Sequence, residues 1–167
     1  MYHAISASRT LLGGTAVARS DRLAELDVES RRYLAAFVLF NQAVADKLGM
    51  HPTDLQCLNL ITIEDGPVTT GRIAELTGLT SGSASRLVDR LVKAGYVDRH
   101  QDSQDRRRVL VQPVPTAVRR LGAVWDELSE GWSELFADYT DDELDLLLRH
   151  MRRTTRLATT QVARLRT

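Results

Sequence analysis

Residues 69–112 read TTGRIAELTGLTSGSASRLVDRLVKAGYVDRHQDSQDRRRVLVQ, and this stretch decides the fold. Thr69 is suited to cap a short helix that ends at Gly78. A second helix begins near Thr80 and keeps its apolar residues at helical spacing up to Gly95. Two short helices joined by a tight turn that contains glycine are typical of a helix-turn-helix motif.

The residues after Gly95 predict a β-hairpin. Their apolar period shortens from that of a helix to that of a strand, and segments 96–99 and 109–112 are rich in β-branched residues. The polar stretch 100–108 between them is long for a hairpin loop and carries three consecutive arginines. A loop of that length favours a functional role. The sequence therefore predicts a wing with arginines at its tip.

The segments on either side predict further helices. Apolar residues recur every three or four positions from about 22 to 48, as in an amphipathic helix. Pro52 opens a helix that is apolar nearly all round, which we expect at the centre of the core. In the C-terminal part, Thr140 and Glu143 have the spacing of a capping box between two helices.

The C-terminal helices carry apolar seams with alternating steps of three and four residues. A seam of this kind needs a partner surface, and the simplest partner is a second copy of the chain. We therefore expect a homodimer. The expected dimerisation contacts are Val118, Leu121, Trp125, Leu128, Leu144, Leu148, Met151, Ala158 and Val162.

The formal net charge is zero, but the charges are segregated along the chain. Residues 69–112 hold eight basic and five acidic side chains, an excess of three positive charges, whereas residues 121–148 hold nine acids and no base. The local field decides where a polyanion docks. The basic excess therefore lies on the helix-turn-helix and the wing.

These features together predict binding to double-stranded DNA. The outward face of helix 80–95 is small and polar, so the helix can lie deep in a major groove, and an arginine on a projecting hairpin can enter a minor groove. Each feature alone also fits an ordinary solvated surface. The expected DNA contacts are Ser81, Ser83, Ser85, Arg86, Arg90, Lys93, Arg106, Arg107 and Arg108. Asp105 is expected to pair with a neighbouring guanidinium and fix the loop.

The expected fold is mainly α with a small β-hairpin wing, in which a winged helix-turn-helix domain lies between N- and C-terminal dimerisation helices. The expected boundaries are a flexible tail at 1–20, the N-terminal dimerisation helix at 21–50, the DNA-binding domain at 51–113 and the C-terminal dimerisation helices at 114–167.

The chain resembles the MarR-type winged-helix regulators from about His51 to Val111. The resemblance is carried by IAELTGL at 73–79, by SRLVDRL at 85–91 with GYV at 95–97, and by DSQDRR at 102–107. It implies a dimer with interlocking terminal helices, a minor-groove contact by Arg107, and Asp105 as its supporting acid. The chain departs from the family pattern at Pro113-Val114, where the family usually has Leu-Thr.

Other classes of function find little support. We find no nucleophile motif, glycine-rich phosphate loop or metal-ligand spacing, so we expect no enzyme activity, cofactor or metal. No apolar run reaches the length of a membrane span, and residues 1–20 lack the pattern of a secretory signal. With a single cysteine as well, we expect a cytoplasmic protein without membrane contacts.

The predicted function is a sequence-specific transcriptional regulator that binds a palindromic operator as a homodimer. We expect a repressor, with activation left open as the alternative, and release by a small aromatic ligand is a secondary expectation. Aromatic side chains offer a pocket for that ligand, although their helical spacing also fits a core: Tyr33, Phe37, Phe40, Trp125 and Trp132. One alternative is a winged-helix interaction module that docks through 121–148 without binding DNA. Another is redox sensing by Cys57, although its apolar helix favours a buried structural cysteine.

Overall fold

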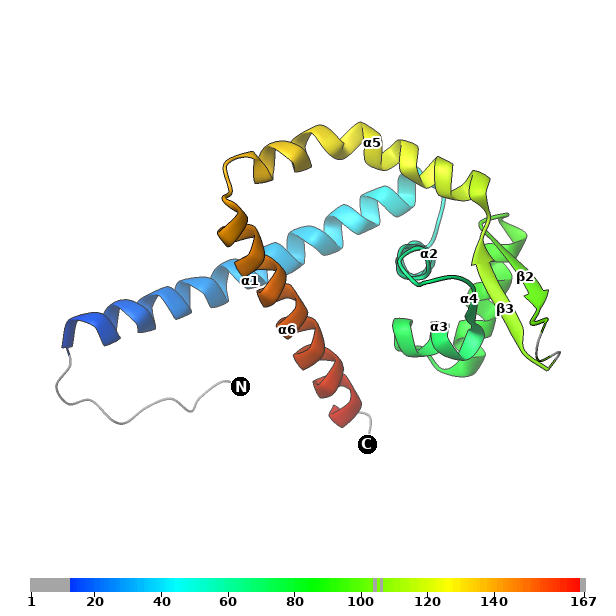
Figure 1. Ribbon diagram of the computed structural model, residues 1–167, viewed down its shortest axis with the longest axis horizontal. Coiled ribbons are helices and arrows are strands. Elements are labelled where there is room, and N and C mark those ends of the chain that lie inside the picture. Colours follow the sequence, from blue (N-terminus) through cyan, green and yellow to red (C-terminus); the bar gives the residue numbers. More distant parts are fainter. Residues whose placement is uncertain (1–12, 104, 106, 166–167) are drawn as a thin grey trace. The chain divides into compact units, whose positions relative to one another are not determined.

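The computed structural model describes residues 13–103, 105 and 107–165. In chain order its elements are α1 (Gly13–Lys47), α2 (Pro52–Thr62), β1 (Val68–Thr69), α3 (Thr70–Thr77), α4 (Ser81–Lys93), β2 (Val97–Gln101), β3 (Val109–Pro113), α5 (Pro115–Ala137) and α6 (Asp141–Leu165) (Figure 1). The chain forms two compact units, Met1–Val118 and Arg119–Thr167. The expected mainly helical fold with a small wing is confirmed.

The sheet of the first unit has three antiparallel strands in the order β1-β3-β2. β2 and β3 form the expected hairpin, in which Arg99 lies opposite Val111. β1 adds a third strand on the other side of β3, with Val68 opposite Val111. The sequence predicted the hairpin but not β1, because two residues are too few to show an alternating pattern.

The core of the first unit is built from α2, α3, α4 and the sheet. Its largest fully buried side chains are Leu55, Cys57, Leu58, Ile73, Leu87, Val88, Leu91, Val97 and Val111. α2 contributes three of them, which confirms its expected central position. Each buried aliphatic side chain contributes on the order of 1.5–3 kcal/mol relative to an exposed one. This core packs α4 against the sheet.

Local capping interactions define the two helices of the helix-turn-helix as the sequence predicted. Thr69 accepts a hydrogen bond from the backbone N–H of Arg72 and begins α3. Thr80 accepts one from Ser83 and begins α4. Between them Gly78 has φ 70°, a left-handed conformation that costs a side-chain-bearing residue energy. The tight turn therefore depends on this glycine.

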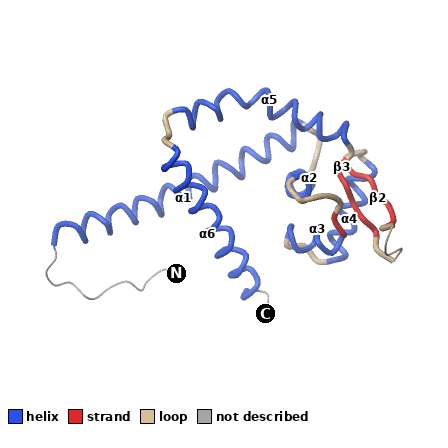
Figure 2. The backbone as a smooth tube through the Cα atoms, viewed as in Figure 1, coloured by secondary structure: helices blue, strands red, loops and turns tan. Residues whose placement is uncertain are grey.

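The N-terminal helix begins earlier than the sequence suggested. α1 is continuous from Gly13 to Lys47, so the expected tail is wrong over 13–20, while residues 1–12 lie outside the described part of the chain (Figure 2). The pair of glycines at 13–14 suggested a loose segment, but glycine is tolerated in the first turn of a helix. The residues that follow, TAVAR, include good helix formers.

The second unit consists of most of α5 together with α6. Thr140 and Glu143 form the predicted capping box, in which the Glu143 carboxylate accepts the backbone N–H of Thr140 at 2.8 Å and Thr140 Oγ1 accepts that of Glu143 at 3.4 Å. Across the whole span Asp141–Leu165, α6 has no buried residue. None of the helices in the described ranges is both long and apolar enough to cross a membrane.

Candidate DNA-binding interface

The outward face of α4 presents a connected set of small polar side chains. Ser81, Ser85 and Arg86 are exposed, and Ser83 is half-buried. The guanidinium of Arg86 donates to Ser83 Oγ at 3.2 Å, while Thr80 Oγ1 donates to the same oxygen at 3.0 Å. Lys93 is exposed at the other end of the helix. The structure thus brings the predicted serines and Arg86 together on one accessible surface.

Arg90 has a different environment from the other predicted contacts. Its Nε and one terminal nitrogen donate to the two carboxylate oxygens of Asp54 at 2.9 and 2.5 Å. Asp54 lies in α2 and its side chain is only 9% exposed. The hydrogen bonds that Arg90 donates to this carboxylate raise the pKa of its guanidinium, which stays charged. The sequence placed Arg90 among the DNA contacts, which stays a prediction, and the structure shows that its guanidinium also joins α4 to α2.

The base of the wing is closed by backbone hydrogen bonds. Asp102 N–H donates to the Arg108 carbonyl at 3.0 Å, and Arg108 N–H donates to that of Asp105 at 2.9 Å. The Arg108 guanidinium lies 3.7 Å from the Asp102 carboxylate. Arg107 is exposed, and the predicted contact Arg106 lies outside the described residues.

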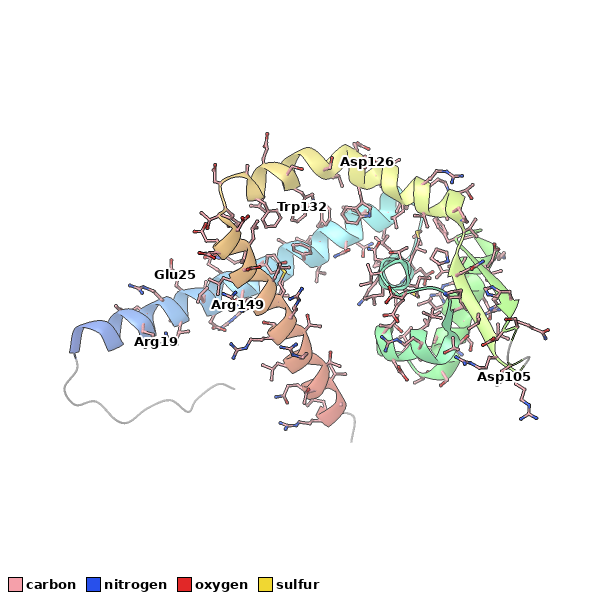
Figure 3. All side chains as sticks on the ribbon, viewed as in Figure 1. Arg19, Glu25, Asp105, Asp126, Trp132 and Arg149 are labelled. Carbon is pink, nitrogen blue, oxygen red and sulfur yellow. The ribbon has the colours of Figure 1, made fainter. Side chains whose placement is uncertain are left out.

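Asp105 shapes the wing through a backbone group. Its carboxylate accepts the N–H of Arg107 at 3.0 Å, where the sequence had suggested a neighbouring guanidinium as partner. Figure 3 shows Asp105 at the loop end of the hairpin. A carboxylate that binds the backbone two residues ahead stabilises a turn. This turn sets the direction in which the Arg107 side chain leaves the hairpin.

Sequence reasoning missed two side chains that hold α4 in place. Asp54 lies among the apolar residues of α2 and was not singled out from the sequence. An acid within such a helix is a signal that could have found it, because a buried carboxylate needs a partner. Arg99 of β2 donates to the Asp89 carboxylate at 2.6 Å and to the Ser85 carbonyl at 3.4 Å. Neither contact is visible in a linear pattern, because the partners lie ten or more residues apart.

The aromatic residues proposed to line an effector pocket fall in two groups. Tyr33, Phe37 and Phe40 are neighbours along α1, with ring centroids 4.6 and 6.2 Å apart for successive pairs. Trp125 and Trp132 belong to α5 in the second unit. Helical spacing alone accounts for the ring contacts within α1, so the aromatic ligand stays a prediction from the sequence.

Cys57 is buried, as the sequence favoured. Burial raises the pKa of the thiol from 9.0 to about 12, and the negative charge of Asp54 makes a smaller contribution in the same direction. The thiolate is the form that reacts with oxidants and electrophiles. The environment of Cys57 therefore argues against a redox sensor.

We expect Cys57 of the folded protein to react with a thiol reagent at pH 8 about 100-fold or more slowly than that of the urea-unfolded chain, because so little thiolate forms. The raised pKa also means that the folded state keeps a proton that the unfolded state loses above pH 9. Stability should therefore fall above pH 9 relative to a Cys57→Ala variant. Equal labelling rates in folded and unfolded protein would contradict this expectation.

A helix-turn-helix followed by a projecting β-hairpin on a small antiparallel sheet defines a winged helix-turn-helix protein. Residues 48–108 match the family model described as MarR family. YcgE of Bacillus subtilis, an HTH-type transcriptional regulator, is 44% identical over 110 residues, which cover 66% of this chain and 71% of YcgE. YwaE of B. subtilis, also an HTH-type transcriptional regulator, is 32% identical over 82 residues, covering 49% of this chain and 48% of YwaE.

Solved structures show the same fold. A MarR family protein from Bacillus stearothermophilus has a TM-score of 0.66 at 20% identity and covers 84% of this chain and 97% of its own. An S. aureus MepR mutant bound to an oligodeoxyribonucleotide has a TM-score of 0.55 at 16% identity, covering 80% of this chain and 97% of its own. The chain belongs to the MarR family. Proteins of this family are DNA-binding transcriptional regulators and not enzymes, which agrees with the class of function predicted from the sequence.

Proposed function

We propose that the chain is a cytoplasmic, homodimeric repressor that binds a roughly palindromic operator. The observation that carries this proposal is the position of α4 and the wing in one unit. A polar helix face and an arginine-bearing hairpin project from the same core. Helices of this kind enter successive major grooves in a dimer, about one helical turn apart.

The N-terminal half of α4 is the proposed reader of the major groove. Ser81, Ser83 and Ser85 are short enough for the helix to approach the bases closely, and their hydroxyls both donate and accept hydrogen bonds. Arg86 is exposed and rests against Ser83, from which it can reach a guanine edge or a phosphate. Lys93 and Arg108 are proposed to contact phosphates, because they are exposed cations at the edges of the same unit.

The wing is proposed to place Arg107 in a minor groove. The Asp105 carboxylate holds the backbone N–H of Arg107, so the direction of that side chain is partly fixed before DNA binds. A narrow minor groove has an enhanced negative potential that attracts arginine. Arg106 is proposed to assist from the same loop, on the strength of its sequence position alone.

The dimer is proposed from the apolar surface left uncovered in the single chain. Val118, Leu148, Met151, Ala158 and Val162 are exposed, Trp125, Leu128 and Leu144 are half-buried, and Leu121 is already buried. α1 adds exposed apolar side chains at Leu23, Leu26, Leu34 and Val38. Exposed apolar area on three helices is more than a monomer usually tolerates. A second copy is the proposed cover.

Selection from a random-sequence duplex library with the purified full chain tests the function. We expect enrichment of an inverted repeat, and sedimentation should give two chains per duplex. Affinity for the enriched duplex should fall steeply with salt, since phosphate contacts release counterions. Failure to enrich any duplex would sink the proposal and favour the interaction module, whereas enrichment with one chain per duplex would refute the dimer alone.

Replacing Arg107 by alanine is expected to weaken binding to the enriched duplex by about tenfold or more, since an arginine contact in a groove contributes ~1–3 kcal/mol. Arg32→Ala on α1 is the matched control, because it removes one exposed positive charge outside the proposed DNA contacts. Fluorescence anisotropy at fixed salt measures both. Equal effects of the two substitutions would show that Arg107 contributes only its charge.

A further inference from the structure

One guanidinium connects the wing to the outward face of α4. Arg99 lies in β2, whose chain leads directly into the wing loop. One terminal nitrogen of Arg99 donates to Asp89 Oδ1 at 2.6 Å, and the other donates to the Ser85 carbonyl at 3.4 Å. Since Ser85 and Asp89 are one helical turn apart, Arg99 spans that turn on the face where Ser85 is exposed.

The charge of Asp89 makes this contact relevant to DNA. Asp89 is the only acidic residue of α4, and its side chain is 61% exposed. A carboxylate on a helix that enters a groove is repelled by phosphates. Arg99, whose side chain is 35% exposed, both neutralises that carboxylate and holds it in one place.

We propose that Arg99 is a positioning residue for DNA recognition: through Asp89 and Ser85 it sets the angle between α4 and the wing. The inference rests on the proposed function. Besides the Arg99 contacts, α4 and β2 share the buried core, to which Leu91 and Val97 both belong, and are joined by the turn at 94–96, where Gly95 has φ 70°. The angle matters because the helix and the hairpin must enter neighbouring grooves at the same time.

The contact has little to do with global stability. Exposed ion pairs contribute about 0–1 kcal/mol to folding, so removing Arg99 should leave the unfolding transition nearly unchanged. Its effect should instead appear in DNA binding. A loss of DNA affinity with an unchanged unfolding transition therefore distinguishes a positioning role from a merely structural one.

A double-mutant cycle tests the proposal with the duplex that the wild-type protein enriches from a random library. We expect Arg99→Gln to weaken binding about tenfold when Asp89 is present, because the charge of Asp89 is then no longer neutralised and the wing loses its contact with α4. In the Asp89→Asn background the same substitution should have an effect of about threefold or less, since side chains in direct contact are coupled. Hydroxyl-radical footprinting should show weaker protection at the flanking minor groove and retained protection under α4.

Two further variants sharpen the result. Arg99→Lys restores the charge but not the two-pronged geometry, so it should recover part of the affinity and not all of it. Arg72→Gln is the matched control, because Arg72 forms a two-pronged ion pair with the half-buried Glu64 that does not join α4 to the wing. We expect its footprint to match that of the wild type.

Two outcomes would overturn the proposal. Equal losses from Arg99→Gln with and without the Asp89→Asn substitution would mean that Arg99 contacts a phosphate directly. An unchanged footprint and affinity in Arg99→Gln and Arg99→Lys would mean that the bridge is irrelevant to recognition. In both cases binding by the wild type would leave the proposed function standing, whereas a wild type that enriches no duplex refutes the function itself.

Discussion

Arg90→Ala is expected to lower the free energy of unfolding by about 2–3 kcal/mol, which is a large part of the stability of a small domain. The substitution leaves the Asp54 carboxylate in the core of α2 and α4 without its partner. A buried charge whose partner is removed is far more costly than an exposed one, although water can enter here because the Arg90 side chain is itself 53% exposed. Urea unfolding followed by circular dichroism measures the change.

Two comparisons make this expectation specific. Lys93→Ala removes an exposed cation from the last turn of the same helix and should shift stability by no more than about 0.5 kcal/mol. Arg90→Ala combined with Asp54→Asn should regain part of the loss, since the second change removes the uncompensated charge. If Arg90→Ala instead weakened DNA binding with unchanged stability, Arg90 would be a DNA contact, as its sequence position had suggested.

The contrast between Arg90 and Thr80 shows which parts of the structure a sequence reveals. Thr80 caps α4 by accepting an N–H three residues ahead, so the residue and its partner lie in one short window. The same holds for Thr69 and for the Thr140 capping box. These signals placed the starts of α3, α4 and α6 correctly, because their physical cause is local.

The partners of Arg90 and Arg99 are set by tertiary packing instead. Asp54 lies 36 residues before Arg90, and nothing in the spacing of α4 separates a cation that faces a groove from one that faces α2. On a helical wheel a cation of either kind simply lies outside the apolar stripe. The candidate interface was therefore predictable as a face and a hairpin, but the ion pairs that join Arg90 to α2 and Arg99 to α4 were not.

Leu91→Ala is expected to destabilise the protein by about 2–5 kcal/mol, because the removed methyl groups leave a cavity between α4 and the rest of the core. Leu91 is 1% exposed and belongs to the buried face of α4. Its neighbour Val92 is 36% exposed, so Val92→Ala serves as the matched control on the same turn. Truncation at Val92 should cost about 0.5 kcal/mol or less.

Because the core holds α4 in place, Leu91→Ala should also reduce DNA binding, and the two effects should be linked in a particular way. At a temperature where the variant is still folded, its affinity for the enriched duplex should approach that of Val92→Ala, since the Leu91 side chain is buried in the core. As the temperature rises, binding should fall in step with the fraction unfolded. Parallel measurement of ellipticity and anisotropy against temperature checks this. A deficit in affinity that persists in the fully folded variant would mean that packing beneath α4 tunes recognition directly, through the same orientation that Arg99 is proposed to control.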